Sequence, residues 1–396
     1  MSPRLHTLLV YIGAIGVVGA LLALLAVSPP FQTTVPPSEI AQTANVAALE
    51  PAGIPGTPTA STSPEEATRE PILPASEPLT EERIEPSPPP SIAAEGTGGT
   101  IVRVENPYPF APESFMAINE RTRAALVNIL CTAGSGSLNP TSGSGIIIDP
   151  RGVILTNAHV AQYVLLAQSE RVNLSCTIRS GAPARALWNA EVLYIPPIWI
   201  KEHAPEITTS RPTGTGEHDY ALLRITGPAS PEVQTKNDFP FLPVDTRNGI
   251  GFLSDLVLAA SYPAEFIGSL VAQHDLYPVS SITPIQELLT FIDGSVDIFS
   301  LRGVLEAQSG SSGGPVVNAW GHVIGIITTT SAGETTAERD LHALTLSYID
   351  RDIAAQAGHG LSPILGSDVA ALAAQFNQQQ ASALVQLLID QIAKKH

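Results

Sequence analysis

The sequence predicts an all-β domain, an antiparallel sandwich or barrel, over residues 106–358. Short apolar runs separated by turn residues are typical of such folds, and a Pro/Gly turn at 149–152 joins two of them into a hairpin. Helical patterns are few: 114–125 is an expected short helix, and the Pro- and Gly-containing stretch 195–217 an expected long loop. The expected strands are 125–131, 143–148, 153–156, 171–179, 186–194, 219–226, 255–261, 296–306, 315–318, 322–330 and 341–346.

Composition narrows the function classes. A net charge of −17 argues against a nucleic-acid partner, because phosphate binding needs a basic surface. The two cysteines, Cys131 and Cys176, form no CxxC or Cys/His cluster, which argues against a structural zinc site. They either form one disulfide, if the domain lies outside the cytoplasm, or are separate core residues.

The N-terminal region, 1–28, is expected to be a transmembrane signal anchor. Residues 8–27 form an apolar, uncharged run, and this run has the length that a helix needs to cross a bilayer. Arg4 precedes this run and Pro29 follows it, so the positive-inside rule places the N-terminus in the cytoplasm and the rest outside. A cleaved signal peptide is the alternative.

Residues 29–105 are rich in Pro, Ser, Thr, Ala and Glu and hold almost no aromatic residues. Such a composition cannot form a packed core, so this stretch is expected to be a disordered, acidic tether. We assign it no role beyond that of a spacer.

The C-terminal segment, 359–396, is expected to be a helical tail. Ser367 is an expected N-cap of its first helix, and the Gln-rich stretch 377–380 is expected to break the helical pair. The tail is either an appendage packed on the β domain or an oligomerisation or docking element, which leaves a homo-oligomer open. Its apolar residues recur at helical spacing at Val369, Leu372, Phe376, Leu384, Leu387, Leu388 and Ile392.

Three residues together indicate nucleophilic catalysis. Ser312 lies in a loop of small residues at 306–317, where backbone N–H groups can approach a substrate closely. His159 follows the predicted hairpin, and Asp219 opens an apolar strand. Each has a structural explanation when taken singly, but together they supply a nucleophile, a base and an orienting carboxylate.

At this point the sequence resembles the trypsin-like serine proteases. The three motifs are residues 156–160 (TNAHV), 219–223 (DYALL) and 310–315 (GSSGGP). The flanking residues 143–149 (GSGIIID) and 321–326 (GHVIGI) are closer to the bacterial HtrA/Deg branch. The resemblance covers about 110–355, and the three motifs in this order form a strong joint signal.

The resemblance implies two packed, antiparallel six-stranded β-barrels with the triad in the cleft between them. It implies that Ser312 is the nucleophile, that His159 is the general base and acid, and that Asp219 orients the imidazole. The backbone N–H groups of Gly310 and Ser312 would form the oxyanion hole. This chemistry needs no metal and no organic cofactor.

Some positions depart from the family pattern. Ser311 stands where trypsin-like enzymes have Asp and HtrA-like enzymes usually have Asn, and no PDZ domain is expected after about residue 360. Glu306 lies where trypsin-like enzymes place the base of the substrate pocket, which would favour Arg or Lys. Thr330 and Leu341 would narrow that pocket and favour small apolar side chains, so both specificities stay open, and Glu306 is expected to be turned away or salt-bridged.

The sequence therefore predicts a membrane-anchored, extracytoplasmic serine endopeptidase that cleaves proteins or peptides in envelope quality control or processing. The alternative is a catalytically silent, protease-like binding module tethered to the membrane.

Overall fold

The computed structural model describes residues 101–134, 138–209, 215–264, 275–291, 294–304, 306–330 and 339–394, without the side chains of 329 and 330. The chain divides into two compact units, Met1–Pro86 and Ser87–His396, and every described residue belongs to the second. The expected membrane segment at 8–27 and nearly all of the expected tether lie outside the described residues. In the described ranges, no helix has both the length and the apolar character that a membrane span requires.

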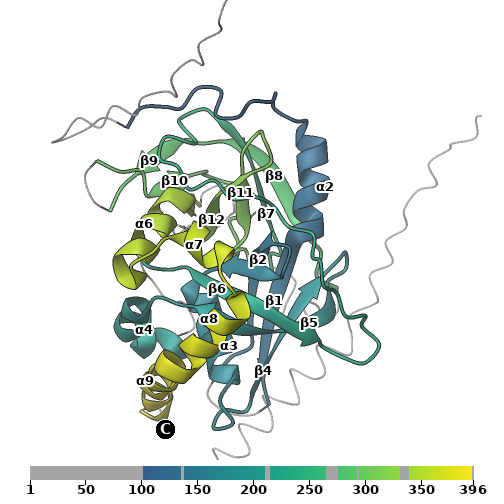
Figure 1. The fold of residues 1–396 in the computed structure, drawn as a ribbon, viewed down its shortest axis with the longest axis vertical. Helices are drawn as coiled ribbons and strands as arrows, with labels where there is room; N and C mark the ends of the chain where they lie inside the picture. The colour runs from purple at the N-terminus through teal and green to yellow at the C-terminus, as the bar shows by residue number, and fades with distance from the viewer. Residues whose placement is uncertain are drawn as a thin grey trace, which may run out of the picture. The chain divides into compact units, whose positions relative to one another are not determined.

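Six antiparallel strands close into a barrel in the first half of the domain (Figure 1). They are β1 (Leu126–Ala133), β2 (Thr141–Asp149), β3 (Val153–Thr156), β4 (Leu174–Ser180), β5 (Arg185–Tyr194) and β6 (Ala221–Pro228), in the order β1-β2-β3-β6-β5-β4. The expected hairpin forms between β2 and β3, with Ile147 opposite Ile154. At its turn Gly152 has a φ of +83°, a conformation that glycine adopts readily.

The second half is a seven-stranded sheet in the order β8-β7-β11-β12-β13-β10-β9. Its strands are β7 (Leu256–Ser261), β8 (Val279–Pro284), β9 (Glu287–Leu289), β10 (Ile298–Ser300), β11 (Pro315–Val317), β12 (Val323–Thr330) and β13 (Leu341–Thr345). Over the residues described, this sheet forms a half-barrel rather than a closed six-stranded barrel, and the two halves together are consistent with the chymotrypsin-like fold that the resemblance implies. Strands β8 and β9 escaped prediction because β8 is mostly half-exposed and contains two serines, while β9 has three residues.

The larger apolar cluster spans both halves of the domain. It contains Ile146 and Leu155 of the first barrel together with Val317 and Val323 of the second sheet. Phe299 and Val316 belong to a separate, smaller cluster inside the second sheet. The first barrel and the second sheet are therefore packed on one another through a shared core.

Helix α2 (Phe115–Ala125) forms where expected, and the hydroxyl of Ser114 accepts a hydrogen bond from the Ala117 N–H at 3.3 Å. The expected loop at 195–217 is wrong, because it contains helix α4 (Pro197–His203) and the 3₁₀ helix η1 (Ala204–Thr208). Pro196, Pro197 and Pro205 lie at helix starts, where a missing N–H costs little. Burial of Trp199 and Ile200 then fixes α4 on the barrel.

Five helical segments follow the last strand: α6 (Leu346–Ala357), α7 (Leu361–Gly366), α8 (Val369–Phe376), the π-helical turn η2 (Asn377–Ala381) and α9 (Ser382–Ala393). Asp368, rather than Ser367, caps α8 by accepting from the Ala370 and Ala371 N–H groups. The expected break at 377–380 is also wrong, because η2 continues α8 into α9. Gln is a good helix former, so this stretch supports the continuation.

The tail packs on the first half of the domain (Figure 1). Helix α8 contacts β5, and α9 contacts α4 and η1. Val369, Phe376 and Leu388 are buried in this contact. Of the two interpretations of the tail, the packed appendage accounts for these apolar residues.

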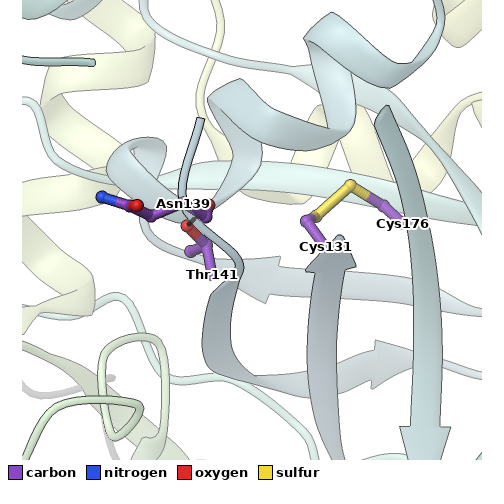
Figure 2. Close-up of a disulfide and its surroundings, with 4 residues drawn as sticks. All are labelled: Cys131, Asn139, Thr141 and Cys176. Atoms are coloured by element: carbon purple, nitrogen blue, oxygen red, sulfur yellow. Dashed lines mark hydrogen bonds between the residues drawn. A yellow bond between two sulfur atoms is a disulfide. The ribbon is translucent and has the colours of Figure 1, made fainter. Parts of the chain in front are cut away.

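A disulfide joins Cys131 on β1 to Cys176 on β4 (Figure 2). The two residues lie opposite each other in the antiparallel register of these neighbouring strands. The bridge therefore links two strands that are already adjacent in the closed barrel, across 45 residues of sequence.

Among the described residues, hydrogen bonds to the rest of the domain are found from Arg103 onward, inside the stretch expected to be the tether. Arg103 pairs with Asp255 at 2.5 Å, and the Val104 N–H donates to the carbonyl of Gly249 at 3.0 Å. Further along, the Tyr108 hydroxyl donates to Asp245 at 2.6 Å. The segment before α2 thus runs along the second sheet and is tied to it.

Candidate functional site

The register of two neighbouring strands brings His159 and Asp219 together. Thr156, the last residue of β3, lies opposite Ala221, the first residue of β6. His159 comes three residues after that pair and Asp219 two residues before it, so both lie beyond the same edge of the barrel. Helix α3 (Ala158–Ala167) begins immediately after β3 and carries His159 in its first turn.

The two side chains make a close, doubly linked pair. His159 Nδ1 lies 2.7 Å from Asp219 Oδ2, and the His159 backbone N–H donates to Oδ1 at 2.9 Å. Asn157, the N-cap of α3, makes no side-chain capping bond, so Asp219 satisfies an N–H of the first turn instead. The positive end of the helix dipole favours a negative carboxylate at this place.

Asp219 is 4 % exposed and is also held from the second sheet. The Thr328 hydroxyl on β12 donates to Asp219 Oδ2 at 2.9 Å. Burial alone would raise the pKa of Asp219, but the charge of His159 and these hydrogen bonds outweigh burial and lower it. Burial likewise opposes the imidazolium of His159, and the Asp219 carboxylate overcomes it, so the pKa of His159 is raised.

The loop that carries Ser312 has a glycine-dependent shape. Gly310 and Gly313 have φ values of +95° and +85°, where side chains are strained. A Cβ on Gly310 would lie 2.9 Å from the Tyr262 carbonyl oxygen, and one on Gly313 would lie 2.2 Å from the Ser144 carbonyl oxygen. Glycine is therefore required at both positions by conformation and by space.

Two backbone donors in this loop are free. Among the described residues, no acceptor hydrogen-bonds to the N–H groups of Gly310 or Ser312. The carbonyl of Ser309 accepts from the Ala264 N–H at 2.8 Å. Because a trans peptide directs its C=O and N–H in opposite directions, this bond also fixes the direction of the Gly310 N–H.

Ser144 on β2 ties the loop to the first barrel. Its hydroxyl donates to the Gly310 carbonyl at 2.7 Å and accepts from the Tyr262 N–H at 2.9 Å. Its own N–H donates to the Ser312 carbonyl at 2.7 Å. One buried residue of the first barrel therefore holds both Gly310 and Ser312.

Nothing in the described ranges hydrogen-bonds to His159 Nε2, and the Ser312 hydroxyl makes no hydrogen bond to it. The imidazole side chain is 27 % exposed, so part of the ring reaches the surface. Catalytic hydrogen bonds are often long without substrate and tighten only in the complex.

Comparison with known families adds an independent observation. The family described as "trypsin-like peptidase domain" matches residues 143–326. This match supports a trypsin-like serine protease. The matched range runs from within β2 to within β12 and contains His159, Asp219 and Ser312. The predicted resemblance is thus confirmed at the level of the trypsin-like domain, and no curated protein matches the chain.

Of the expected pocket residues, Glu306 and Leu341 are both fully buried. Glu306 is 0 % exposed, and both of its carboxylate oxygens lack a hydrogen-bond partner in the described part of the chain. Of the two expectations for Glu306, the salt bridge does not form within the described residues, and the side chain is enclosed in the interior. Leu341 lies inside the apolar cluster of the second sheet, and the side chain of Thr330 lies outside what the structure describes.

Three supporting residues of the site escaped the sequence reasoning. They are Thr328, Ser144 and Ser261, and each is a small hydroxyl residue inside a strand. The Ser261 hydroxyl donates to that of Ser311 at 2.9 Å. Ser311, which departs from the family pattern, is therefore hydrogen-bonded to β7. Only Ser144 had a sequence signal, the glycines on either side of it, because long-range hydrogen bonds leave no local pattern.

Proposed function

We propose that this chain is a serine endopeptidase that works through an acyl-enzyme, with Ser312, His159 and Asp219 as its triad. The observation that carries the proposal is the 2.7 Å contact from His159 Nδ1 to the buried Asp219. This contact fixes the tautomer in which Nε2 is the basic nitrogen.

The chemistry follows from these positions. The Ser312 hydroxyl attacks the scissile carbonyl while His159 Nε2 takes its proton. His159 then gives that proton to the leaving amine, and water repeats the sequence to release the acyl group. Asp219 stays ionised and offsets the charge on the imidazolium.

The free N–H groups of Gly310 and Ser312 supply the oxyanion hole in this proposal. Removing one donor of this kind costs about 3–4 kcal/mol of transition-state stabilisation in such enzymes. Their direction is preset by the hydrogen bonds from the Ala264 N–H to the Ser309 carbonyl and from the Gly314 N–H to the Ser311 carbonyl, so little reorganisation is needed when the oxyanion forms.

We extend the proposal to the place of action. The apolar run at 8–27 would anchor the chain in a membrane, with the protease domain outside the cytoplasm. The Cys131–Cys176 disulfide supports an oxidising compartment. The flanking motifs 143–149 and 321–326 support the HtrA/Deg branch, with envelope protein quality control or processing as the task.

The test is active-site labelling of the full-length protein with a fluorophosphonate probe. Wild type should label at one site, and Ser312→Ala should not label. Ser175→Ala, which removes an exposed serine from β4, is the matched control and should label like wild type. Equal labelling of wild type and Ser312→Ala would exclude Ser312 as the nucleophile.

The second candidate function is a catalytically silent binding module. The absence of a hydrogen bond between Ser312 and His159, both described residues, is the observation that favours it. A folded wild-type protein that neither labels nor cleaves a peptide library would support this candidate over the enzyme.

The same peptide library addresses specificity. Glu306 is enclosed, so it cannot touch a substrate side chain in this conformation. We therefore expect Glu306→Gln to leave the preferred residue before the cleaved bond unchanged. A preference for Arg or Lys that disappears in Glu306→Gln would instead place this carboxylate at the base of the substrate pocket.

A further inference from the structure

The two residues that flank Asp219 in the chain are bound to one carboxylate. His218 Nδ1 lies 2.8 Å from Asp352 Oδ2, and the Tyr220 hydroxyl donates to the same oxygen at 2.7 Å. Asp352 belongs to α6, more than 130 residues away in sequence. Gln356, one turn later on α6, also donates to Oδ2 at 2.7 Å.

The backbone at His218 needs such support. Its φ is +58°, in the left-handed region that side chains seldom adopt without help from their surroundings. The His218 N–H donates to the Tyr348 hydroxyl at 3.0 Å, and its carbonyl accepts from the Tyr220 N–H at 2.9 Å. Backbone and ring of His218 are thus both held by α6.

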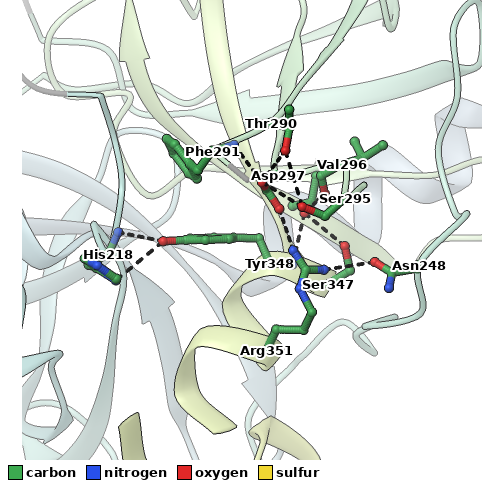
Figure 3. A network of polar contacts seen from close by, with 11 residues as sticks. His218, Asn248, Thr290, Phe291, Ser295, Val296, Asp297, Ser347, Tyr348 and Arg351 are labelled. Carbon is green, nitrogen blue, oxygen red and sulfur yellow. Dashed lines mark hydrogen bonds and ion pairs between the residues drawn. The ribbon is translucent and has the colours of Figure 1, made fainter. Parts of the chain in front are cut away.

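Helix α6 is itself anchored to the second sheet (Figure 3). Arg351 pairs with Asp297 at 2.5 Å and donates to the side chain of Asn248 at 2.9 Å. Asp297 is 1 % exposed and accepts from the Phe291 N–H at 2.7 Å. Figure 3 shows Tyr348 and Arg351 reaching from this helix toward His218 and Asp297 respectively.

The Asp352 carboxylate can influence Asp219 without contacting it. Its side chain is 10 % exposed, so its hydrogen bonds face little competition from water. Within the described residues it hydrogen-bonds to neither Asp219 nor His159; its partners His218 and Tyr220 are the residues on either side of Asp219. A shift of these neighbours would turn the Asp219 carboxylate away from His159 Nδ1.

We propose that Asp352 is a positioning residue for the triad, which fixes the direction of Asp219 by holding His218 and Tyr220. This inference rests on the proposed function. The predicted effect is on orientation: without Asp352 the protein folds, but Asp219 no longer holds the His159 ring in one position.

The first measurement compares Asp352→Ala with wild type in hydrolysis of a peptide substrate by the full-length protein. A misplacement of a catalytic group by about 1 Å costs on the order of 10²-fold in rate. We expect a kcat lower by about 10- to 100-fold with KM nearly unchanged. Asp352→Asn, which keeps one oxygen acceptor, should recover part of the loss.

Asp350→Ala is the control on the same helix. Asp350 accepts from the Leu361 N–H at 2.7 Å and touches neither His218 nor Tyr220. It should affect stability without the loss in kcat. An equal loss in kcat for Asp350→Ala and Asp352→Ala would show that Asp352 only stabilises α6. That result would overturn the inference.

The pH profile separates positioning from stability. If Asp219 turns away, the pKa of His159 falls toward its ordinary value, and the acid limb of kcat/KM moves to lower pH. His218 also titrates, with its pKa raised by Asp352 first and by Glu217 and Glu202, and Tyr348, Tyr220 and Gln356 face it as well. A second imidazole therefore has to be removed from the comparison.

The variant His218→Asn removes the second imidazole, because Asn tolerates the left-handed backbone and does not titrate. Adding Asp352→Ala to His218→Asn should still move the acid limb to lower pH through Tyr220. No movement, with kcat unchanged, would overturn the positioning role. Wild type that shows no Ser312-dependent labelling would instead refute the proposed function, so the two failures are distinguishable.

Discussion

Three donors converge on the carboxylate of Asp219: the ring and the backbone N–H of His159, and the hydroxyl of Thr328. At the scale of single residues, this carboxylate has the most demanding environment in the site. Because it is buried and ionised, its contacts must compensate the loss of water. The consequence is a raised pKa at His159, which a pH profile can measure.

The first residue-scale prediction concerns Asp219→Asn. We expect kcat to fall by about 10⁴-fold, the size of loss that Ser-His-Asp enzymes show for this change. The reaction needs neutral His159, so wild-type kcat/KM should rise with pH at a midpoint above the ordinary value of 6.5. Asp219→Asn should move that midpoint to lower pH, while Asp390→Asn, an exposed control, should not.

Glu306 gives a second residue-scale prediction. Burial raises its pKa to about 6 from 4.5, against the smaller, lowering effects of the Ser281 hydroxyl and of its own backbone. The unfolded chain releases this proton at lower pH than the folded chain does. The stability that the protonated form provides is therefore complete below pH 4.5 and is lost as the pH rises through 6.

Glu306→Gln removes this dependence. The free energy of unfolding of the variant, relative to wild type, should increase by about 2 kcal/mol between acidic pH and pH 8. Urea denaturation over that range measures it, with Glu170→Gln, an exposed residue, as the control. A difference between Glu306→Gln and wild type that stays constant with pH would show that the carboxylate is solvated.

At the scale of elements, strand pairing and helix starts decide where the chemistry lies. The β3–β6 register places His159 and Asp219 at one edge, and the start of α3 faces the carboxylate. The β1–β4 pair carries the disulfide, with Cys131 opposite Cys176. These two strands close the same barrel on which the candidate triad depends.

The element-scale prediction is that the disulfide contributes about 2–4 kcal/mol to the free energy of unfolding, mainly by restricting the unfolded chain. Reductant should lower the urea midpoint of wild type toward that of Cys131→Ala/Cys176→Ala and leave the variant unchanged. A midpoint that does not respond to reductant in wild type would contradict this.

At the scale of the whole domain, the candidate site exists only where the two halves meet. Thr328 reaches Asp219 from the second sheet, and Ser144 reaches Gly310 from the first barrel. These contacts set the Ser312 loop against the His159–Asp219 pair.

The domain-scale prediction is tested by Ser144→Ala. It leaves the Tyr262 N–H without its acceptor, so it should destabilise the protein by about 1–3 kcal/mol. It should also lower kcat more than it raises KM, because the Gly310–Ser311 peptide, in the loop that leads to Ser312, loses its hydrogen bond to the first barrel. Ser142→Ala, two residues earlier on β2, is the control, and an equal kinetic effect in both variants would exclude a specific role for Ser144.

The sequence could predict what local patterns encode. Eleven of the described strands, the β2–β3 hairpin, helix α2 and the three candidate triad residues follow from apolar runs, turn residues and short motifs. The helices at 197–208 and the continuous α8–α9 pair could not be predicted from the sequence, because their prolines and glutamines are compatible with either helix or loop. Strand β9 is so short that its sequence pattern cannot be distinguished from that of a loop.

Thus the sequence by itself determined the β class of the domain, the trypsin-like resemblance and the identity of the residues that can do chemistry. Only the tertiary structure decided that Glu306 is enclosed without a partner, that Thr328 and Ser144 support the site, and that Asp352 holds both neighbours of Asp219. The physical reason is the range of the interactions. Hydrophobic period and turn chemistry act over a few residues, whereas these hydrogen bonds join positions more than one hundred residues apart.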